Sequence, residues 1–205
     1  MSAHSLRLPG ERLALFSDAV IAITITLLVL EIRLPSDAGE LGDAELWATL
    51  AQMSPEFLAY LISFAVIGLY WLNHYIKLSY IKEVDRGLLA INLLFLLFVG
   101  IVPFTTALIS ENPSSVGTSL YAAGMVCCGL SLMWLWVYAD RRGMIDDSAD
   151  RAQRRRLMMS TMLSSIVFAL SIPIAFIQPD VAKFLWLLIV PVGLIARPLL
   201  ARGKP

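Results

Sequence analysis

The chain has 205 residues, of which 58% are hydrophobic and 16% are charged, and its mean hydropathy is +0.75. This composition excludes an ordinary soluble domain and predicts an integral membrane protein. The formal net charge is zero, which argues against a nucleic-acid partner, because binding phosphate backbones requires a clustered positive excess. The two cysteines, Cys127 and Cys128, are adjacent in an apolar run and are expected to be free packing residues rather than a disulfide or metal ligands.

The first hydrophobic stretch contains polar residues that need an explanation. Residues 13–30 are long enough to cross the hydrocarbon core as a helix, yet an ionised aspartate at mid-bilayer costs about 2.5–3.5 kcal/mol. We therefore expect Asp18 to have a partner, to lie near an interface or to be protonated. Cleavage as a signal peptide is not expected, because Asp18 interrupts the run early and no small-x-small site follows before Pro35.

Six hydrophobic spans follow one another along the chain. They are expected at about residues 13–32, 55–76, 88–109, 118–138, 157–177 and 182–200. Ser54 and Pro55 form a favourable helix start, with serine as the cap. Three prolines inside spans are expected to produce kinks rather than gating hinges: Pro103, Pro173 and Pro191. The predicted fold class is an all-α integral membrane protein, with residues 1–205 forming one domain of six transmembrane helices.

Lysine and arginine are distributed unequally between the two ends of such a bundle. If the amino terminus is cytoplasmic, all sixteen basic residues except Arg33 and Lys183 lie on the cytoplasmic side. The positive-inside rule therefore predicts that both termini are cytoplasmic. The outer loop at residues 33–53 is acidic, which either concentrates cations near an entrance or reflects solvation alone. The arginines at 154–156 are explained equally well by topology or by binding to anionic lipid headgroups.

A polar cluster is expected where the first two spans meet. In antiparallel helices, Asp18 shares a leaflet with Trp71, Asn73 and His74, whose side chains can donate hydrogen bonds to the carboxylate. Arg12 is expected nearby at the interface. Two roles stay open for this cluster: it holds the helices together, as polar residues in membrane bundles commonly do, or it is linked to protons or gating.

The first span has two distinguishable faces. At 100° per residue, Ile23, Thr26, Leu27 and Leu30 form one stripe, and Asp18 lies about 140° from Ile23. A stripe of this kind, taken alone, usually faces lipid or packs against another helix. The sequence shows no nucleophile with a base, no glycine-rich phosphate loop and no paired carboxylates within a span. An enzyme is therefore not expected, and neither is a cofactor or a bound metal.

Two motifs carry a resemblance to a known family. Arg12-Leu13-Ala14-Leu15-Phe16-Ser17-Asp18 resembles the R-x-x-x-F-S-D signature of the endolysosomal potassium channel family, the transmembrane protein 175 family. Trp71-Leu72-Asn73-His74 resembles the tryptophan-x-x-histidine element of its second helix. Many bacterial relatives follow that histidine with another, where this chain has Tyr75.

The resemblance implies a potassium-permeable cation channel with weak to moderate preference for potassium over sodium. Animal relatives carry two six-span repeats, so the single set here implies the bacterial form, a homotetramer in the inner membrane. The first helices would then line the central axis. Ile23, Leu27 and Leu30 would form the constriction and Thr26 a polar layer, with potassium as the permeant ion. Phe16 and Ser17 belong to the signature motif.

Two other functions stay open at the level of the sequence. A proton-linked secondary transporter is also compatible with the sequence, because Asp18 and His74 are titratable residues within spans and prolines interrupt other spans. The two three-span halves show no convincing internal repeat, which argues against it. A non-transporting membrane scaffold would use the polar cluster only for structure.

Overall fold

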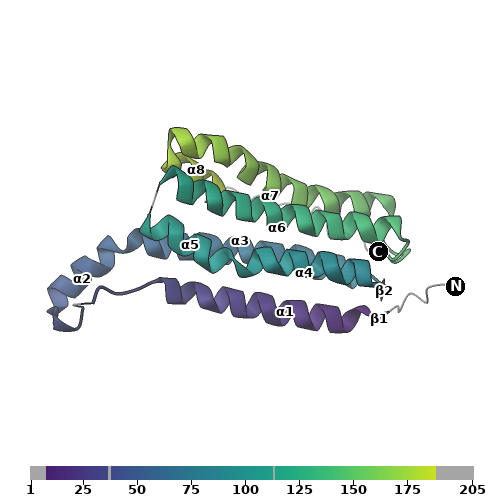
Figure 1. Cartoon of the computed structure of the whole chain (residues 1–205), viewed down its shortest axis with the longest axis horizontal. Helices are drawn as coiled ribbons and strands as arrows, with labels where there is room; N and C mark the ends of the chain where they lie inside the picture. Colours follow the sequence, from purple (N-terminus) through teal and green to yellow (C-terminus); the bar gives the residue numbers. More distant parts are fainter. Residues whose placement is uncertain (1–7, 37, 113, 188–205) are drawn as a thin grey trace.

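The computed structural model describes residues 8–36, 38–112 and 114–187, and their dominant feature is a set of long helices running side by side (Figure 1). These are α1 (Gly10–Leu27), α3 (Ser54–Ser79), α4 (Arg86–Gly100), α5 (Val102–Glu111), α6 (Ser115–Arg141) and α7 (Arg151–Ile177). By length and composition, five described segments are able to cross a membrane: Gly10–Glu31, Ser54–Ser79, Arg86–Glu111, Ser115–Arg141 and Arg151–Ile177. The helical, membrane-spanning class is therefore confirmed.

The sixth predicted span is described only at its start. A short helix, α8 (Pro179–Leu187), begins near the expected position of this span. Residues 188–200, and with them Pro191, lie outside the described residues. The structure thus gives five membrane-length helical segments in its described part, where the sequence predicts six spans in the whole chain.

Polar caps extend three helices beyond their apolar spans. The carboxylate of Asp85 accepts a hydrogen bond from the N–H of Leu88, and Asp150 does the same for Gln153. Ser114 caps α6 by accepting from the N–H of Gly117. These side chains satisfy backbone donors that have no partner within a helix. The predicted cap at Ser54 is wrong, because Ser54 is the first residue of α3 and Met53 precedes it without a side-chain cap.

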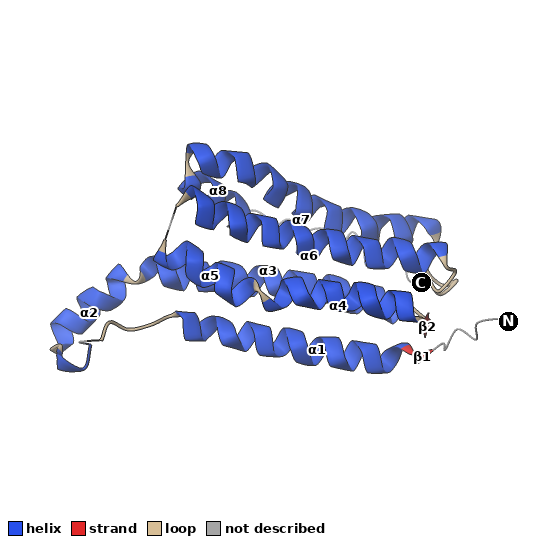
Figure 2. Cartoon of the chain, viewed as in Figure 1, coloured by secondary structure: helices blue, strands red, loops and turns tan. Residues whose placement is uncertain are grey.

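Two predicted spans are not single α-helices. The first tightens into a 3₁₀ helix, η1 (Leu28–Glu31), before the chain leaves the bundle. The third is divided at Ile101 into α4 and α5. Pro103 lies in the first turn of α5, and because proline has no backbone N–H it cannot continue the ladder of α4. Figure 2 shows this break as a short loop between the two helices. Pro173, by contrast, lies inside α7 without ending it.

The helices pack in two adjoining apolar clusters, with α6 contributing to both. One cluster contains Phe95, Tyr121 and Phe168, and the other contains Leu88, Leu135 and Leu157. Lipid tails are as apolar as these side chains, so close packing and polar contacts, rather than the hydrophobic effect, must hold membrane helices together.

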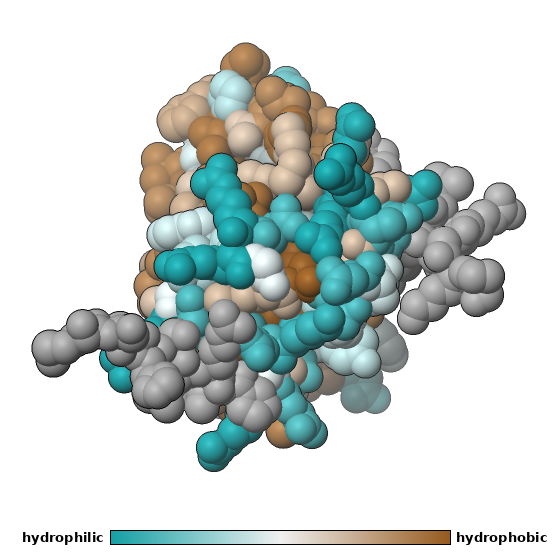
Figure 3. All heavy atoms as spheres, turned by 90° about the vertical axis from the view of Figure 1, so that its right-hand side faces the viewer, coloured by the Kyte–Doolittle hydropathy of each residue, from teal (hydrophilic) through white to brown (hydrophobic). Residues whose placement is uncertain are grey.

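The two ends of the bundle differ in charge and in secondary structure. We call the end formed by the starts of α1, α4 and α7 the basic end. There β1 (Leu8–Pro9) pairs antiparallel with β2 (Glu83–Val84), and an isolated bridge joins Ile81 to Ile145. Figure 3 looks onto this end, where hydrophilic side chains gather.

The opposite end, which we call the acidic end, carries η2 (Ala38–Glu40) and α2 (Asp43–Gln52). The sequence predicts only a loop there. Helix α2 projects from the end of the bundle (Figure 1), and its Trp47 is exposed.

Candidate functional site

Helix α1 has one face packed against the bundle and one face left uncovered. The packed face consists of Leu13, Ser17, Ile21, Thr24 and Leu28, all buried. On the uncovered face, the exposed fractions of the predicted pore-lining side chains are 59% for Ile23, 42% for Leu27 and 64% for Leu30. The stripe is therefore not covered by the rest of the described chain. Leu28 and Leu30 lie in η1, which continues α1.

Thr26 is exposed on the same face as Ile23, and its hydroxyl is oriented by the backbone. The hydroxyl donates a hydrogen bond to the carbonyl of Ile23 at 2.8 Å. Because its only proton is used in this bond, the oxygen presents lone pairs, and not a donor, to whatever faces it. A hydroxyl held in this way is a potential cation ligand.

Asp18 is joined to α3 by a direct hydrogen bond. The indole N–H of Trp71 donates to Oδ1 of Asp18 at 2.8 Å. An indole nitrogen is a donor only, and a carboxylate is the acceptor with which it forms a strong, charge-assisted bond. Asp18 is half-buried, so one of its oxygens is tied to α3 beside the buried face of α1.

His74 contacts α4, not Asp18, through a hydrogen bond. Its Nε2 lies 2.8 Å from Oδ1 of Asn92. The amide nitrogen of Asn92 donates to Oγ of Ser17 at 2.9 Å, and Ser17 donates in turn to the carbonyl of Leu13. Ser17 therefore links the signature motif on α1 to His74 through Asn92. His74 also stacks on Phe95, with ring centroids 5.0 Å apart.

Asn73 and Lys77 face α7. The oxygen of Asn73 accepts a hydrogen bond from Ser160 at 3.0 Å, and its amide donates to the carbonyl of Leu69. The expected contact with Asp18 is replaced by these bonds, because Asn73 lies two residues after Trp71 and is therefore rotated by about 200° around α3, to the opposite side. The fully buried ammonium of Lys77 donates to the hydroxyl of Thr161.

Within this arrangement α3 is the common partner of three helices. Trp71 binds α1, His74 binds α4, and Asn73 and Lys77 bind α7. Arg12, which the sequence places near the cluster, is exposed on α1 and forms no ion pair with a described residue. Phe16 is exposed too.

Four members of this network are not predicted from the sequence: Asn92, Lys77, Ser160 and Thr161. Asn92 is a single amide in an otherwise apolar span, and this isolation is the signal that could have identified it. Lys77 is assigned to a cytoplasmic loop by the charge count, whereas α3 continues to Ser79 and buries it. Ser160 and Thr161 carry no distinctive sequence signal. Among the described residues, no group of three or more histidine, cysteine or acidic side chains could hold a metal ion.

Comparison with known proteins identifies the family. Residues 12–103 match the family described as endosomal/lysosomal potassium channel TMEM175. A potassium channel of Streptomyces collinus is 37% identical over 173 residues, covering 82% of this chain and 82% of the relative. This chain belongs to the TMEM175 family. The matched range contains both motifs that carry the resemblance in the sequence.

Other TMEM175 proteins extend the comparison. The crystal structure of a lysosomal potassium-selective channel TMEM175 homologue from Chamaesiphon minutus superimposes with a TM-score of 0.78 at 27% identity, covering 94% of this chain and 98% of the homologue. The endosomal/lysosomal proton channel TMEM175 of Homo sapiens is 40% identical over 101 residues, which are 47% of this chain and 20% of that protein. The TMEM175 matches support a multi-pass membrane protein that is a cation channel.

Proposed function

We propose that this protein is a potassium-permeable cation channel in which four copies surround one axis and α1 of each copy lines the ion path. The observation that carries the proposal is the uncovered stripe of Ile23, Leu27 and Leu30 on a helix whose opposite face is buried. A membrane helix with an aliphatic stripe also suits contact with lipid. The bacterial relatives named potassium channels favour the pore.

Rings of aliphatic side chains would close this path. An α-helix with its side chains is about 10–12 Å across, so four helices around an axis leave a gap that isoleucine or leucine nearly fills. Such a constriction gates by occlusion and dewetting. Conduction then requires rotation of the side chains or outward tilting of the helices. Because aliphatic rings provide no ligands, selectivity would depend on ion hydration and on the lone pairs of Thr26. This predicts weak to moderate preference for potassium over sodium.

The orientation belongs to the same proposal. We place the basic end in the cytoplasm, and with it the amino terminus, because arginine and lysine in short loops are retained on that side. The carboxyl terminus is then cytoplasmic too, if residues 182–200 form the sixth span. In a bacterial cell the membrane would be the inner membrane. The bilayer and three further copies of the chain are then its partners, and no cofactor is required.

Proton permeation is a second candidate. The vertebrate relatives are named proton channels, and Asp18 and His74 are titratable groups beside the buried face of α1. A proton-linked transporter differs from both a potassium channel and a proton channel, because its potassium flux depends strictly on a proton gradient.

Flux measurements on purified protein in liposomes test the proposal. A potassium gradient alone should drive potassium flux through the wild-type protein. Replacing Ile23 with Ser should change conductance and the potassium-to-sodium ratio, because it removes the aliphatic ring. Leu97→Ser is the matched control, since Leu97 is 66% exposed on α4 and is outside the proposed pore. It should leave both quantities unchanged.

Each alternative has its own outcome. Flux that requires a proton gradient supports the transporter, proton current without potassium current supports the second candidate, and no flux under any ion condition supports a scaffold. If Ile23→Ser behaves like Leu97→Ser while potassium flux persists, α1 does not form the constriction.

A further inference from the structure

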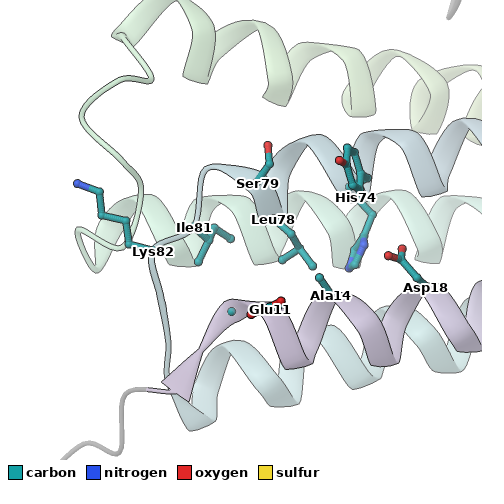
Figure 4. Close-up of a pocket in the computed structure, with 10 residues that line it drawn as sticks. Glu11, Ala14, Asp18, His74, Leu78, Ser79, Ile81 and Lys82 are labelled. Atoms are coloured by element: carbon teal, nitrogen blue, oxygen red, sulfur yellow. The ribbon is translucent and has the colours of Figure 1, made fainter.

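A cavity of about 340 Å³ opens between α1 and α3 at the basic end. Glu11, Ala14 and Asp18 line it from α1, and His74 lines it from α3. Figure 4 shows the imidazole of His74 and the carboxylate of Asp18 directed into the space between the two helices. This cavity adjoins the buried network but is distinct from the uncovered stripe on α1.

The hydrogen bonds of the network fix the tautomer of His74. Ser17 donates its proton to the carbonyl of Leu13, so it must accept from the amide nitrogen of Asn92. The oxygen of Asn92 therefore faces Nε2 of His74, and Nε2 must carry the proton that is donated to it. In the neutral ring, Nδ1 is then an acceptor.

That acceptor is buried and has no partner. His74 is fully buried, and its Nδ1 forms no hydrogen bond in the described part of the chain. Leaving a buried polar atom without a partner is costly, so such an atom is normally satisfied by water or a ligand. The missing partner must be a hydrogen-bond donor.

The acidic groups of the cavity are acceptors too. The hydroxyls of Tyr75 and Ser79 also line it, and Ser79 donates its proton to the carbonyl of Ile76. Asp18 uses Oδ1 for Trp71, and no described residue donates to its Oδ2. Glu11 forms no ion pair with a residue that the structure describes. Lys82 reaches the rim, but its ammonium is held 3.2 Å from Asp146 and points away from Asp18 in Figure 4. The carboxylates of Asp18 and Glu11 outnumber the single ammonium of Lys82 in the lining, so the site has net negative charge.

These features select one class of ligand. A potassium ion offers no proton to an imidazole lone pair, and no group of three metal-ligating residues occurs in the described chain. A protonated primary amine supplies both a positive charge and three N–H donors. The cavity lies at the small end of the range for small-molecule sites, which is about 300–1,000 Å³.

We propose that this cavity binds a small primary ammonium ion, with Nδ1 of His74 and the carboxylate of Asp18 as acceptors and the carboxylate of Glu11 adding negative charge to the lining. The bound ion joins α1 to α3 beside the Asp18–Trp71 bond. Occupancy therefore opposes any movement of α1 away from α3 and lowers flux; this effect on flux rests on the proposed function, whereas binding does not.

Calorimetry on the purified full chain in lipid nanodiscs tests binding without reference to conduction. Ethylammonium is the probe, and tetramethylammonium, which has the same charge but no N–H group, is the control ligand. Ethylammonium should bind saturably and tetramethylammonium should not. Glu11→Gln should weaken ethylammonium binding by about twofold or more, because it removes a negative charge from the lining. Glu45→Gln, at the acidic end, should leave it unchanged.

The histidine signal supplies an independent measurement. The chain has two histidines, so ¹⁵N-histidine labelling of a His4→Gln variant leaves His74 as the only ring observed. Its Nδ1 resonance should shift on addition of ethylammonium and not on addition of tetramethylammonium. Equal binding of the two ions, unchanged affinity in Glu11→Gln, or an unmoved Nδ1 resonance at saturation overturns the proposal. Binding that persists without any effect on flux refutes only the link to conduction.

Discussion

At the scale of single residues, the polar side chains of α1 and α3 are arranged by what each can donate or accept. Trp71 can only donate, and it binds a carboxylate; Asn92 can do both, and it lies between a donor and an acceptor. Each bond also crosses between helices. In a membrane, such bonds contribute to helix association that apolar burial alone cannot provide.

Removing the donor of Trp71 tests the contribution of the Asp18 bond. Trp71→Phe keeps an aromatic ring but leaves the half-buried carboxylate without its donor. We expect a loss of about 1–2 kcal/mol of stability, near the value for hydrogen bonds to charged groups and reduced by the membrane setting. The fraction of protein that survives heating, measured by size-exclusion chromatography, reports it. Trp134→Phe, at an exposed position on α6, is the control, and an equal loss in both variants would contradict the expectation.

The sequence predicts part of this arrangement and misses the rest for a physical reason. Antiparallel packing of two neighbouring spans places Asp18 level with Trp71, and the structure joins them. Antiparallel packing fixes the level of a residue along the helix, but it does not fix how far each helix is rotated about its own axis. This rotation turns Asn73 toward Ser160 and His74 toward Asn92. Burial of Lys77 depends on contacts with α7, more than eighty residues away, which no local pattern predicts.

At the scale of helices, the contact between α6 and α7 depends on Gly129. A Cβ atom at Gly129 would lie 1.9 Å from the hydroxyl of Ser165 and 3.1 Å from that of Tyr70. No real side-chain contact is this short, so glycine is required for the two helices to approach.

Substitution at Gly129 tests this close approach. Gly129→Ala should destabilise the protein by about 1–3 kcal/mol, the usual range for overpacking. In Gly124→Ala, the added Cβ meets nothing within 4 Å, and alanine's higher helix propensity should leave stability equal or raised. Thermal unfolding of the two variants in the same detergent measures the difference. The double variant Gly129→Ala/Ser165→Gly should recover part of the loss; no recovery would mean that another contact is responsible.

The loops of the basic end are joined by Asp146. The backbone N–H and hydroxyl of Ser148 and the ammonium of Lys82 lower the pKa of Asp146 below its ordinary value. A lowered pKa adds stability that is present above the ordinary value and is lost as pH falls through the lowered one. Carboxyl ¹³C NMR should therefore show Asp146 titrating below an unperturbed aspartate. Lys82→Met should raise its pKa, and Lys183→Met, at the other end, should not. An unchanged pKa in Lys82→Met would assign the shift to Ser148 alone.

The helical elements follow from the sequence more closely than their connections do. Apolar length places α3, α6 and α7, and the caps Ser114 and Asp150 explain why α6 and α7 begin earlier than the apolar runs. The pairing of β1 with β2 joins segments about 75 residues apart through backbone atoms alone, so side-chain patterns give no sign of it. Helix α2 has only ten residues, too few to cross a membrane, so a search for apolar spans does not detect it.

At the scale of the whole molecule, the exposed apolar surface must meet either lipid or other copies of the chain. Helices α1, α4 and α7 all carry large exposed aliphatic side chains, such as Ile23, Leu97 and Leu170. Because all of these side chains are aliphatic, their chemistry alone does not show which of them face lipid and which face another copy of the chain. If the homotetramer forms, the exposed side chains of α1 should become protected at the axis while Leu97 stays accessible to lipid. Native mass spectrometry counts the copies, and a monomer that conducts would contradict the proposed assembly.

The proposed orientation is tested by the accessibility of the two ends in intact cells. In a variant without native thiols, Cys127→Ala/Cys128→Ala, a single cysteine is placed at Glu40 near the acidic end or at Arg141 at the basic end. Both side chains are exposed, so burial does not limit their reaction. A membrane-impermeant maleimide should label Glu40→Cys in intact spheroplasts and Arg141→Cys only after permeabilisation, because the positive-inside rule keeps the arginine-rich loops in the cytoplasm. Labelling of Arg141→Cys in intact spheroplasts would reverse the orientation. It would also place the cavity between α1 and α3 on the outer side, where an external amine could reach it directly.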